Sequence, residues 1–160
     1  MKKKLTVNKI KFKRFKKPLV CLTAYTTPMS EILDKYCDII LVGDSLGMVL
    51  HGMKSTREVT LEMMIIHAKA VRRGVSTSLL VVDMPMGTYE KNPIIALKNA
   101  RRIIKETDCD AVKVEGGVKV YKTIKYLVDN NIPVMGHVGL LPQSVIKKTR
   151  SEEHTSELQS

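Results

Sequence analysis

Five short, almost uninterrupted apolar runs recur along the chain, and segments with helical periodicity separate them. The runs cover residues 19–24, 39–42, 79–82, 111–114 and 134–136. Continuous apolar character of this kind is typical of strands that are buried on both faces of a parallel sheet. Because strands that alternate with helices imply right-handed βαβ crossovers, the chain is expected to have an α/β fold.

Four of the intervening segments carry helix signals. We expect helices from Thr27 and Pro28, from Thr60, from Asn92 and Pro93, and over about 118–129, with a fifth beginning at Pro142. The apolar side chains expected to face the sheet are, helix by helix, Ile32, Leu33 and Tyr36; Leu61, Met64, Ile65, Ala68 and Val71; Ile94, Leu97, Ala100 and Ile104; and Val120, Ile124 and Leu127. Gly74 suits the exit of the second of these helices.

Two architectures compete for this pattern, an open doubly wound sheet and a closed (β/α)8 barrel. A dinucleotide-binding doubly wound fold would need a glycine-rich turn after its first strand, and residues 25–28 (YTTP) supply none. We therefore favour the barrel. Since such a barrel takes about 250 residues, the five strands of this 160-residue chain correspond to about the first five β/α units, over residues 18–149.

The two ends of the chain differ from its centre. Residues 1–17 contain nine Lys or Arg and no acidic residue, while the whole chain carries a formal charge of +11. This segment could bind nucleic acid, but it has only Phe12 and Phe15 as aromatics and no nucleic-acid module follows. We prefer a basic lead-in that covers one end of the barrel. Residues 150–160 have one apolar residue and resemble the in-frame translation of a sequencing adapter, so we interpret them as a non-native tail rather than a natural polar terminus.

We expect the protein to be located in the cytoplasm. No window holds 18 uninterrupted apolar residues, and no apolar segment follows the charged N-terminus. Cys21, Cys37 and Cys109 are widely separated and form no paired motif, which favours a reducing environment and buried free thiols. The sequence therefore predicts no membrane span and no disulfide framework.

Polar side chains stand where each predicted strand ends. They are Thr23 and Tyr25, Asp44 and Ser45, Asp83, Lys113 and Glu115, and His137. The C-terminal ends of parallel strands meet at one edge of an α/β sheet, so these side chains are expected to surround one mouth. Three carboxylates there make a hard oxygen site that suits Mg²⁺.

Such a site fits the chemistry of a small 2-oxo acid. The acid can chelate a divalent cation through its keto and carboxylate oxygens, and the cation then stabilises the enolate that follows proton loss. Lys113 adds positive charge where that oxyanion develops. Taken singly, Asp44 and Asp83 could be turn residues and His137 a hydrogen-bonded scaffold residue. Their placement at equivalent ends of successive strands favours the site.

Four segments in this order resemble the ketopantoate hydroxymethyltransferase family. They are residues 41–48 (LVGDSLGM), 70–74 (AVRRG), 112–117 (VKVEGG) and 136–143 (GHVGLLPQ), and the resemblance covers about residues 18–149. It implies a Mg²⁺-dependent (β/α)8 barrel of the phosphoenolpyruvate/pyruvate superfamily that assembles as a homodecamer. The implied reaction transfers a hydroxymethyl group from 5,10-methylenetetrahydrofolate to 3-methyl-2-oxobutanoate, which gives 2-dehydropantoate for pantothenate and coenzyme A biosynthesis.

The resemblance also implies roles for individual residues. Asp44 and Asp83 resemble the direct metal ligands, and Glu115 resembles the third acidic residue of the metal site. The substrate contacts correspond to Asp44, Ser45, Asp83 and Lys113, with Tyr25 and His137 as accessory candidates. Thr26 departs from the acidic residue that is usual in the family after the first strand.

No catalytic base is assigned within this chain. The family's general base is a glutamate on a later strand, so we expect the 160-residue chain by itself to be inactive. Two alternatives stay open. One is another lyase or mutase of the same superfamily that acts on a pyruvate-like 2-oxo acid, and the other is a basic nucleic-acid-binding module.

Overall fold

The computed structural model describes residues 4–13, 17–139 and 143. Five strands form one parallel sheet in the order β1-β2-β3-β4-β5. They are β1 (Cys21–Thr23), β2 (Ile39–Val42), β3 (Leu79–Asp83), β4 (Ala111–Glu115) and β5 (Val134–His137). Each strand lies beside the next one along the chain, without the reversal of order that defines a doubly wound sheet. This order is that of a (β/α) barrel, as predicted.

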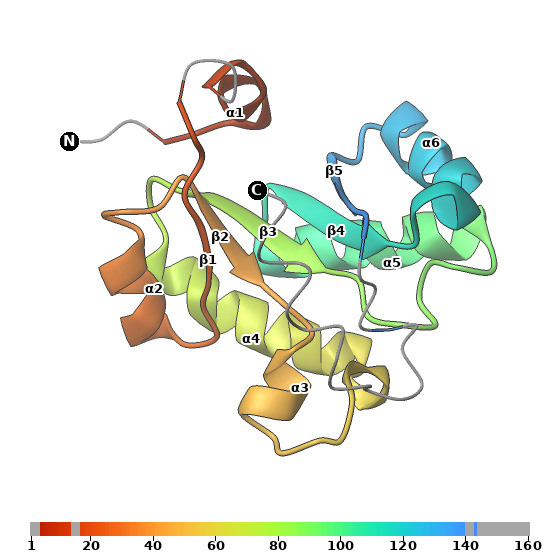
Figure 1. The fold of residues 1–160 in the computed structure, drawn as a ribbon, viewed down its shortest axis with the longest axis horizontal. Helices are drawn as coiled ribbons and strands as arrows, with labels where there is room; N and C mark the ends of the chain where they lie inside the picture. Colours follow the sequence, from red (N-terminus) through yellow and green to blue (C-terminus); the bar gives the residue numbers. More distant parts are fainter. Residues whose placement is uncertain (1–3, 14–16, 140–142, 144–160) are drawn as a thin grey trace.

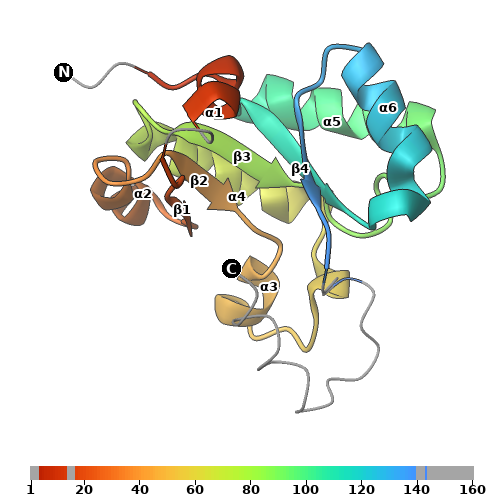
Figure 2. The ribbon, with the colours of Figure 1, turned by 45° about the horizontal axis from the view of Figure 1, so that its top comes forward.

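Helices follow the strands in the βαβ pattern. They are α2 (Thr27–Leu33), α3 (Leu46–Val49), α4 (Leu61–Gly74), α5 (Pro93–Thr107) and α6 (Tyr121–Asp129), with short 3-10 turns η1 (Thr56–Glu58) and η2 (Gly117–Val120). Helices α4 and α5 lie against β2, β3 and β4, and α6 lies against α5 and β5 (Figure 1). Turned by 45°, the same arrangement shows α1 (Val7–Lys13) and α3 near opposite ends of the strands (Figure 2).

The main core lies between the helices and the sheet. In α4 the buried residues are the five predicted from periodicity, Leu61, Met64, Ile65, Ala68 and Val71. Thr60 caps this helix by accepting a hydrogen bond from the backbone N–H of Met63 at 3.2 Å. The expected strands and the helices after Asn92 and over 118–129 are likewise present, within a few residues of the predicted bounds.

The predicted inward face of α2 is only partly right, because Leu33 packs against the main core but Ile32 and Tyr36 do not. Ile32 is 62% exposed and Tyr36 is 71% exposed, whereas the buried residue of α2 is Ser30. The Ser30 hydroxyl lies 3.0 Å from the carbonyl of Val71, and Thr27 donates to the carbonyl of Ala70 at 2.7 Å. These contacts show that α2 docks onto the end of α4 through hydroxyl groups rather than through an apolar stripe.

Two smaller predictions also fail. Ile94 is 67% exposed because the buried face of α5 runs through Ala96, Leu97, Ala100 and Ile103 instead. Cys21 is exposed because β1 is the first strand of the described sheet and has a neighbour on one side only. Cys37 and Cys109 are buried, as expected.

The basic N-terminal segment contains a helix that the sequence analysis did not predict. Val7 and Ile10 of α1 pack against a second apolar cluster formed by Ile39, Leu79, Val81 and Ala111 on the sheet. Lys4 forms an ion pair with Asp110, and Lys13 forms one with Asp38. This packing agrees with a segment that covers one end of the barrel. The expected helix at Pro142 and the tail at 150–160 lie outside the described residues.

A single carboxylate, Asp34, anchors the start of β3. It accepts hydrogen bonds from the backbone N–H groups of Ser76 (3.1 Å), Thr77 (3.0 Å) and Ser78 (2.7 Å) and from the hydroxyl of Ser76 (2.8 Å). Burial alone would raise the pKa of Asp34, but these hydrogen bonds outweigh it and hold the pKa below its usual value.

Replacing Asp34 by asparagine is therefore expected to lower the free energy of unfolding at pH 7 by about 1–3 kcal/mol. Since the folded-state pKa of Asp34 is depressed, its contribution is present above the unfolded pKa of about 3.9 and is lost as the pH falls further. Urea unfolding of both proteins at pH 7 and pH 3 checks this. A difference that stays constant between the two pH values would contradict it.

None of the helices in the described ranges combines the length and the apolar character needed to span a lipid bilayer.

Candidate functional site

The C-terminal ends of β1, β2 and β3 bring two hydroxyls and a carboxylate around one point. A Cβ atom built on Gly43 would lie 3.3 Å from Oγ of Ser45, 3.5 Å from Oδ2 of Asp83 and 3.8 Å from Oη of Tyr25. The hydroxyls of Tyr25 and Ser45 are hydrogen-bonded at 2.7 Å. A side chain at position 43 would therefore contact all three of these groups.

Strand register places Lys113 beside Asp83. The two residues are direct partners in the parallel pairing of β3 and β4, so their side chains project on the same side of the sheet. Nζ of Lys113 donates to Oδ1 of Asp83 at 2.7 Å, and both side chains are largely buried. The other carboxylate oxygen of Asp83 accepts from the backbone N–H of Asp44 at 3.2 Å.

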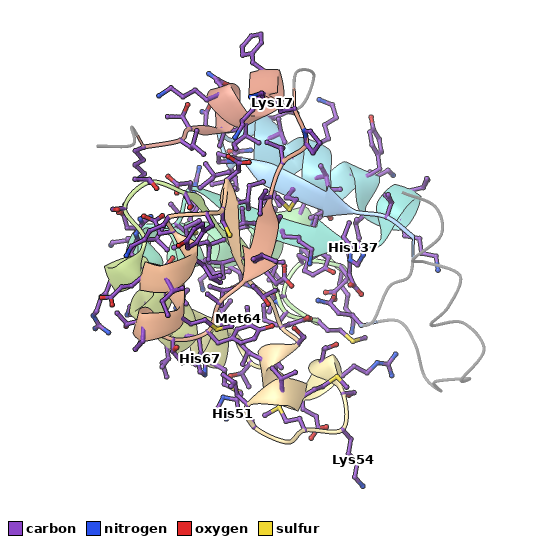
Figure 3. The ribbon with its side chains drawn as sticks, turned by 60° about the vertical axis from the view of Figure 1, so that its left-hand side comes forward. Lys17, His51, Lys54, Met64, His67 and His137 are labelled. Atoms are coloured by element: carbon purple, nitrogen blue, oxygen red, sulfur yellow. The ribbon has the colours of Figure 1, made fainter. Side chains whose placement is uncertain are left out.

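Glu115 and His137 form the far side of the site. They are register partners at the ends of β4 and β5. Nδ1 of His137, labelled in Figure 3, lies 3.4 Å from Oε2 of Glu115 but makes no hydrogen bond among the described residues, although the atom is buried. Burial and the nearby Lys113 lower the pKa of His137, so the ring is neutral at pH 7.

Gln143 connects the carboxylates of Asp44 and Glu115. No role was expected for this residue from the sequence. Its Nε2 donates to Oδ2 of Asp44 at 2.7 Å and to the carbonyl of Met84 at 3.2 Å. Its backbone N–H donates to Oε1 of Glu115 at 2.8 Å. Position 143 ends one of the four family-like segments, which is the only signal that pointed to it.

Tyr89 was also missed. It is buried, and its hydroxyl lies 2.7 Å from Oε1 of Gln143 and 3.0 Å from the carbonyl of Glu115. The backbone N–H of Glu115 donates to the same hydroxyl at 3.1 Å. Burial raises the pKa of Tyr89, so the group acts as a neutral hydrogen-bonding partner. A tyrosine in a loop after a strand gives no sequence signal for this position.

Electrostatically, the site carries more negative charge than its one lysine balances. Burial and the neighbouring Asp83 raise the pKa of Asp44 to about 6. Burial also raises the pKa of Asp83, despite Lys113, and that of Glu115. Three raised carboxyl pKa values in one cluster mean that an additional positive charge would be favourable here.

The donor chemistry fits a hard divalent cation. The available donors are carboxylate oxygens, which Mg²⁺ prefers, and Mg²⁺ takes only one or two of them directly while keeping several waters. Within residues 4–13, 17–139 and 143, no group of three His, Cys, Asp or Glu side chains is already spaced as a complete ligand set. The backbone N–H of Asp44 donates to Asp83, and Gln143 bonds to both Asp44 and Glu115, so the three carboxylate residues are neighbours and one or two of them could serve Mg²⁺.

Most of the residues that the sequence placed at the strand ends gather at this edge. Tyr25, Ser45 and Asp83 surround Gly43. Hydrogen bonds then connect Asp83 to Lys113 and Asp44, and through Gln143 to Glu115. His137 lies at the periphery, and Thr23, which ends β1, makes no side-chain hydrogen bond to the cluster within the described part of the chain.

The chain was compared with known proteins. A family model described as ketopantoate hydroxymethyltransferase matches residues 4–157. The chain belongs to the ketopantoate hydroxymethyltransferase family. Among the family's curated members, the 3-methyl-2-oxobutanoate hydroxymethyltransferase of Rhizobium etli is 57% identical over 143 residues, which are 89% of this chain and 52% of that protein. The corresponding protein of Cereibacter sphaeroides is 62% identical over 128 residues, covering 80% of this chain and 46% of its own length.

Solved structures confirm the barrel fold expected for the family. A 2,3-dimethylmalate lyase, a member of the PEP mutase/isocitrate lyase superfamily, superposes with a TM-score of 0.57 at 14% identity, over 82% of this chain and 52% of that one. A phosphoenolpyruvate phosphomutase from Streptomyces platensis gives a TM-score of 0.54 at 15% identity, over 69% and 38%. At these identities the likeness concerns the fold alone. The chain spans about half the length of the ketopantoate hydroxymethyltransferases it matches.

Proposed function

We propose that this chain supplies the metal- and 2-oxo-acid-binding part of an enzyme site that transfers a hydroxymethyl group from 5,10-methylenetetrahydrofolate to 3-methyl-2-oxobutanoate. The product, 2-dehydropantoate, would serve pantothenate and coenzyme A biosynthesis. The observation that carries the proposal is the hydrogen-bonded cluster of Asp44, Asp83, Lys113 and Glu115 at one edge of a parallel sheet. A family match over most of the chain supports the same reaction.

Asp44 and Asp83 would hold Mg²⁺, with Glu115 as the third acidic residue of the metal site. When bound, the cation polarises the keto group of the substrate and lowers the energy of its enolate. Lys113 contributes a fixed positive charge at the same edge, where negative charge develops on the keto oxygen as the neighbouring carbon loses a proton. Its ion pair with Asp83 keeps the ammonium group in position for that role.

Tyr25 and Ser45 would orient the substrate. Of two hydroxyls bonded to each other, one donates and the other accepts, so one O–H remains free to donate elsewhere. A substrate carboxylate is the natural acceptor for such a donor. Gln143 is not expected to react, because its side-chain amide is already engaged by Asp44 and Tyr89.

The rest of the reaction is proposed from the family. The hydroxymethyltransferase name implies a one-carbon donor, and we assign 5,10-methylenetetrahydrofolate to it. The general base is the glutamate expected on a later strand than β5. We further propose a cytoplasmic enzyme that assembles as a homodecamer.

A second candidate stays within the same fold. The structural neighbours include a 2,3-dimethylmalate lyase and an oxaloacetate acetylhydrolase, so a lyase acting on another 2-oxo or 2-hydroxy acid is the alternative. A lyase reaction would need no folate, whereas the hydroxymethyl transfer does. Nucleic-acid binding by the N-terminal segment is less favoured, because Lys4 and Lys13 pair with acidic residues of the barrel and Val7 and Ile10 are used in packing.

The substitution Asp44→Asn is expected to weaken Mg²⁺ binding at least about tenfold, because it removes a charged oxygen ligand. Isothermal titration calorimetry with Mg²⁺, in the presence and absence of 3-methyl-2-oxobutanoate, measures this directly. The matched control is Asp129→Asn, which removes an equally charged but exposed carboxylate from α6. Equal losses in the two variants, or none in Asp44→Asn, would reject the proposed metal site.

The reaction itself is tested by joining this chain to the C-terminal half of the Rhizobium etli relative. We expect the joined protein to turn over 3-methyl-2-oxobutanoate only with methylenetetrahydrofolate, and the 160-residue chain alone to show no turnover. Turnover of a different 2-oxo acid without folate would favour the lyase. Turnover by the chain alone would contradict the assignment of the base to a later strand.

A further inference from the structure

Two histidines outside the candidate site face each other across two elements. His51 lies in the loop after α3, and His67 lies in the middle of α4. Their Nε2 atoms are hydrogen-bonded at 3.0 Å, and the ring centroids are 5.2 Å apart with planes inclined by 75°. Both residues are labelled in Figure 3. His51 is exposed and His67 is half-buried, so the pair is open to solvent.

A backbone carbonyl fixes the tautomer of His67. Nδ1 of His67 lies 2.9 Å from the carbonyl oxygen of Tyr25, which can only accept a hydrogen bond. The neutral ring therefore carries its proton on Nδ1, and its Nε2 presents a lone pair to His51. Histidines that bind metals usually have this arrangement, since the non-ligating N–H is held by a carbonyl or carboxylate.

The spacing of the two nitrogens suits a shared transition-metal ion. Two imidazole nitrogens at about 2.0–2.1 Å from a tetrahedral zinc ion are about 3.3 Å apart. In a square-planar arrangement with the same bond lengths they are about 2.9 Å apart. The observed 3.0 Å falls between these values, so only a small shift of the exposed His51 is needed.

We propose that His51 and His67 bind one divalent transition-metal ion, such as Zn²⁺, Ni²⁺ or Cu²⁺, through their Nε2 atoms, with water completing the coordination. Metal binding would replace the hydrogen bond between the two Nε2 atoms, and the proton on Nε2 of His51 would move to Nδ1, a neutral tautomer that the exposed ring can adopt. Because imidazole suits these ions and carboxylates suit Mg²⁺, the histidine pair and the Asp44 and Asp83 cluster select different metals.

The test uses the full 160-residue chain, purified without a polyhistidine tag, and titrated with Ni²⁺ or Zn²⁺ in excess Mg²⁺. We expect one site per chain, and His51→Gln to weaken it at least about tenfold. His51 is exposed, so this variant keeps the fold, which circular dichroism verifies. The matched control is His154→Gln, which removes a histidine outside the pair.

Cu²⁺ electron paramagnetic resonance gives an independent readout. Nitrogen hyperfine structure from two imidazoles is expected in the parent protein and from one imidazole in either His51→Gln or His67→Gln. The proposal would be overturned if the parent and His51→Gln bound the metal equally well, or if His154→Gln lost as much affinity as His51→Gln. Either result would indicate adventitious binding at the surface. If Asp44→Asn still binds the transition metal with unchanged affinity, the histidine site is distinct from the proposed Mg²⁺ site.

Discussion

Replacing Gly74 by alanine is expected to disrupt the docking of α2 on α4 and to lower the free energy of unfolding by at least about 3 kcal/mol. An added Cβ would lie 2.2 Å from Oγ of Ser30, 2.6 Å from the carbonyl oxygen of Thr27 and 2.8 Å from the backbone nitrogen of Glu31. Two of these atoms belong to the backbone of α2, which cannot rotate away. The whole helix would have to move, and its hydroxyl contacts with Ala70 and Val71 would be lost.

Urea unfolding followed by circular dichroism measures this loss. The matched control is Gly136→Ala in β5, where an added Cβ meets no atom within 4 Å and the backbone is not in the left-handed region. We expect the midpoint of the control to stay close to that of the parent. If Gly74→Ala were no less stable than Gly136→Ala, the close approach of α2 and α4 would not be required for the fold.

The contrast between α4 and α2 shows what periodicity predicts. In α4 the apolar stripe is wide and regular, so all five inward residues could be assigned from spacing. In α2 the same rule chose Ile32, Leu33 and Tyr36, of which only Leu33 packs against the core. The contact with α4 is made by Ser30 and Thr27, which bond to carbonyls at the end of that helix. Such a contact depends on where those carbonyls lie in space. Gly74 is likewise needed because a Cβ at this position would overlap α2, and not because it forms a helix-ending turn.

That the candidate residues gather at one edge of the sheet could be predicted because it depends on topology. In a parallel sheet every strand ends at the same edge, so Asp44, Asp83 and Glu115 could be grouped without knowing any distance. The pairings within the group depend on register and loops. Only the alignment of β3 with β4 makes Lys113 the partner of Asp83, and only the path of the chain after β5 brings Gln143 back to Asp44.

The substitution Lys113→Met is expected to cost about 3–5 kcal/mol of folding free energy at neutral pH, because it leaves Asp83 buried without its charge partner. Among the described residues, Asp83 would keep one hydrogen bond, from the backbone N–H of Asp44. The matched control is Lys125→Met, which breaks an exposed ion pair with Asp129 on α6. That loss is expected to stay within about 0.5 kcal/mol. Similar urea midpoints for the two variants would contradict the prediction.

The double variant Asp83→Asn/Lys113→Met separates the two possible origins of that cost. If the loss in Lys113→Met comes from an unpaired buried charge, neutralising Asp83 removes the charge and restores much of the stability, so the double variant is more stable than Lys113→Met alone. If the loss comes instead from the packing of the lysine stem, the second substitution restores nothing and adds its own cost. Recovery of stability would also show why this cluster is suited to binding. If the double variant is at least as stable as the parent, the pair is kept at a cost to the fold. This cluster, in which burial raises the carboxyl pKa values, would then hold charge in place for a ligand that the folded chain alone does not require.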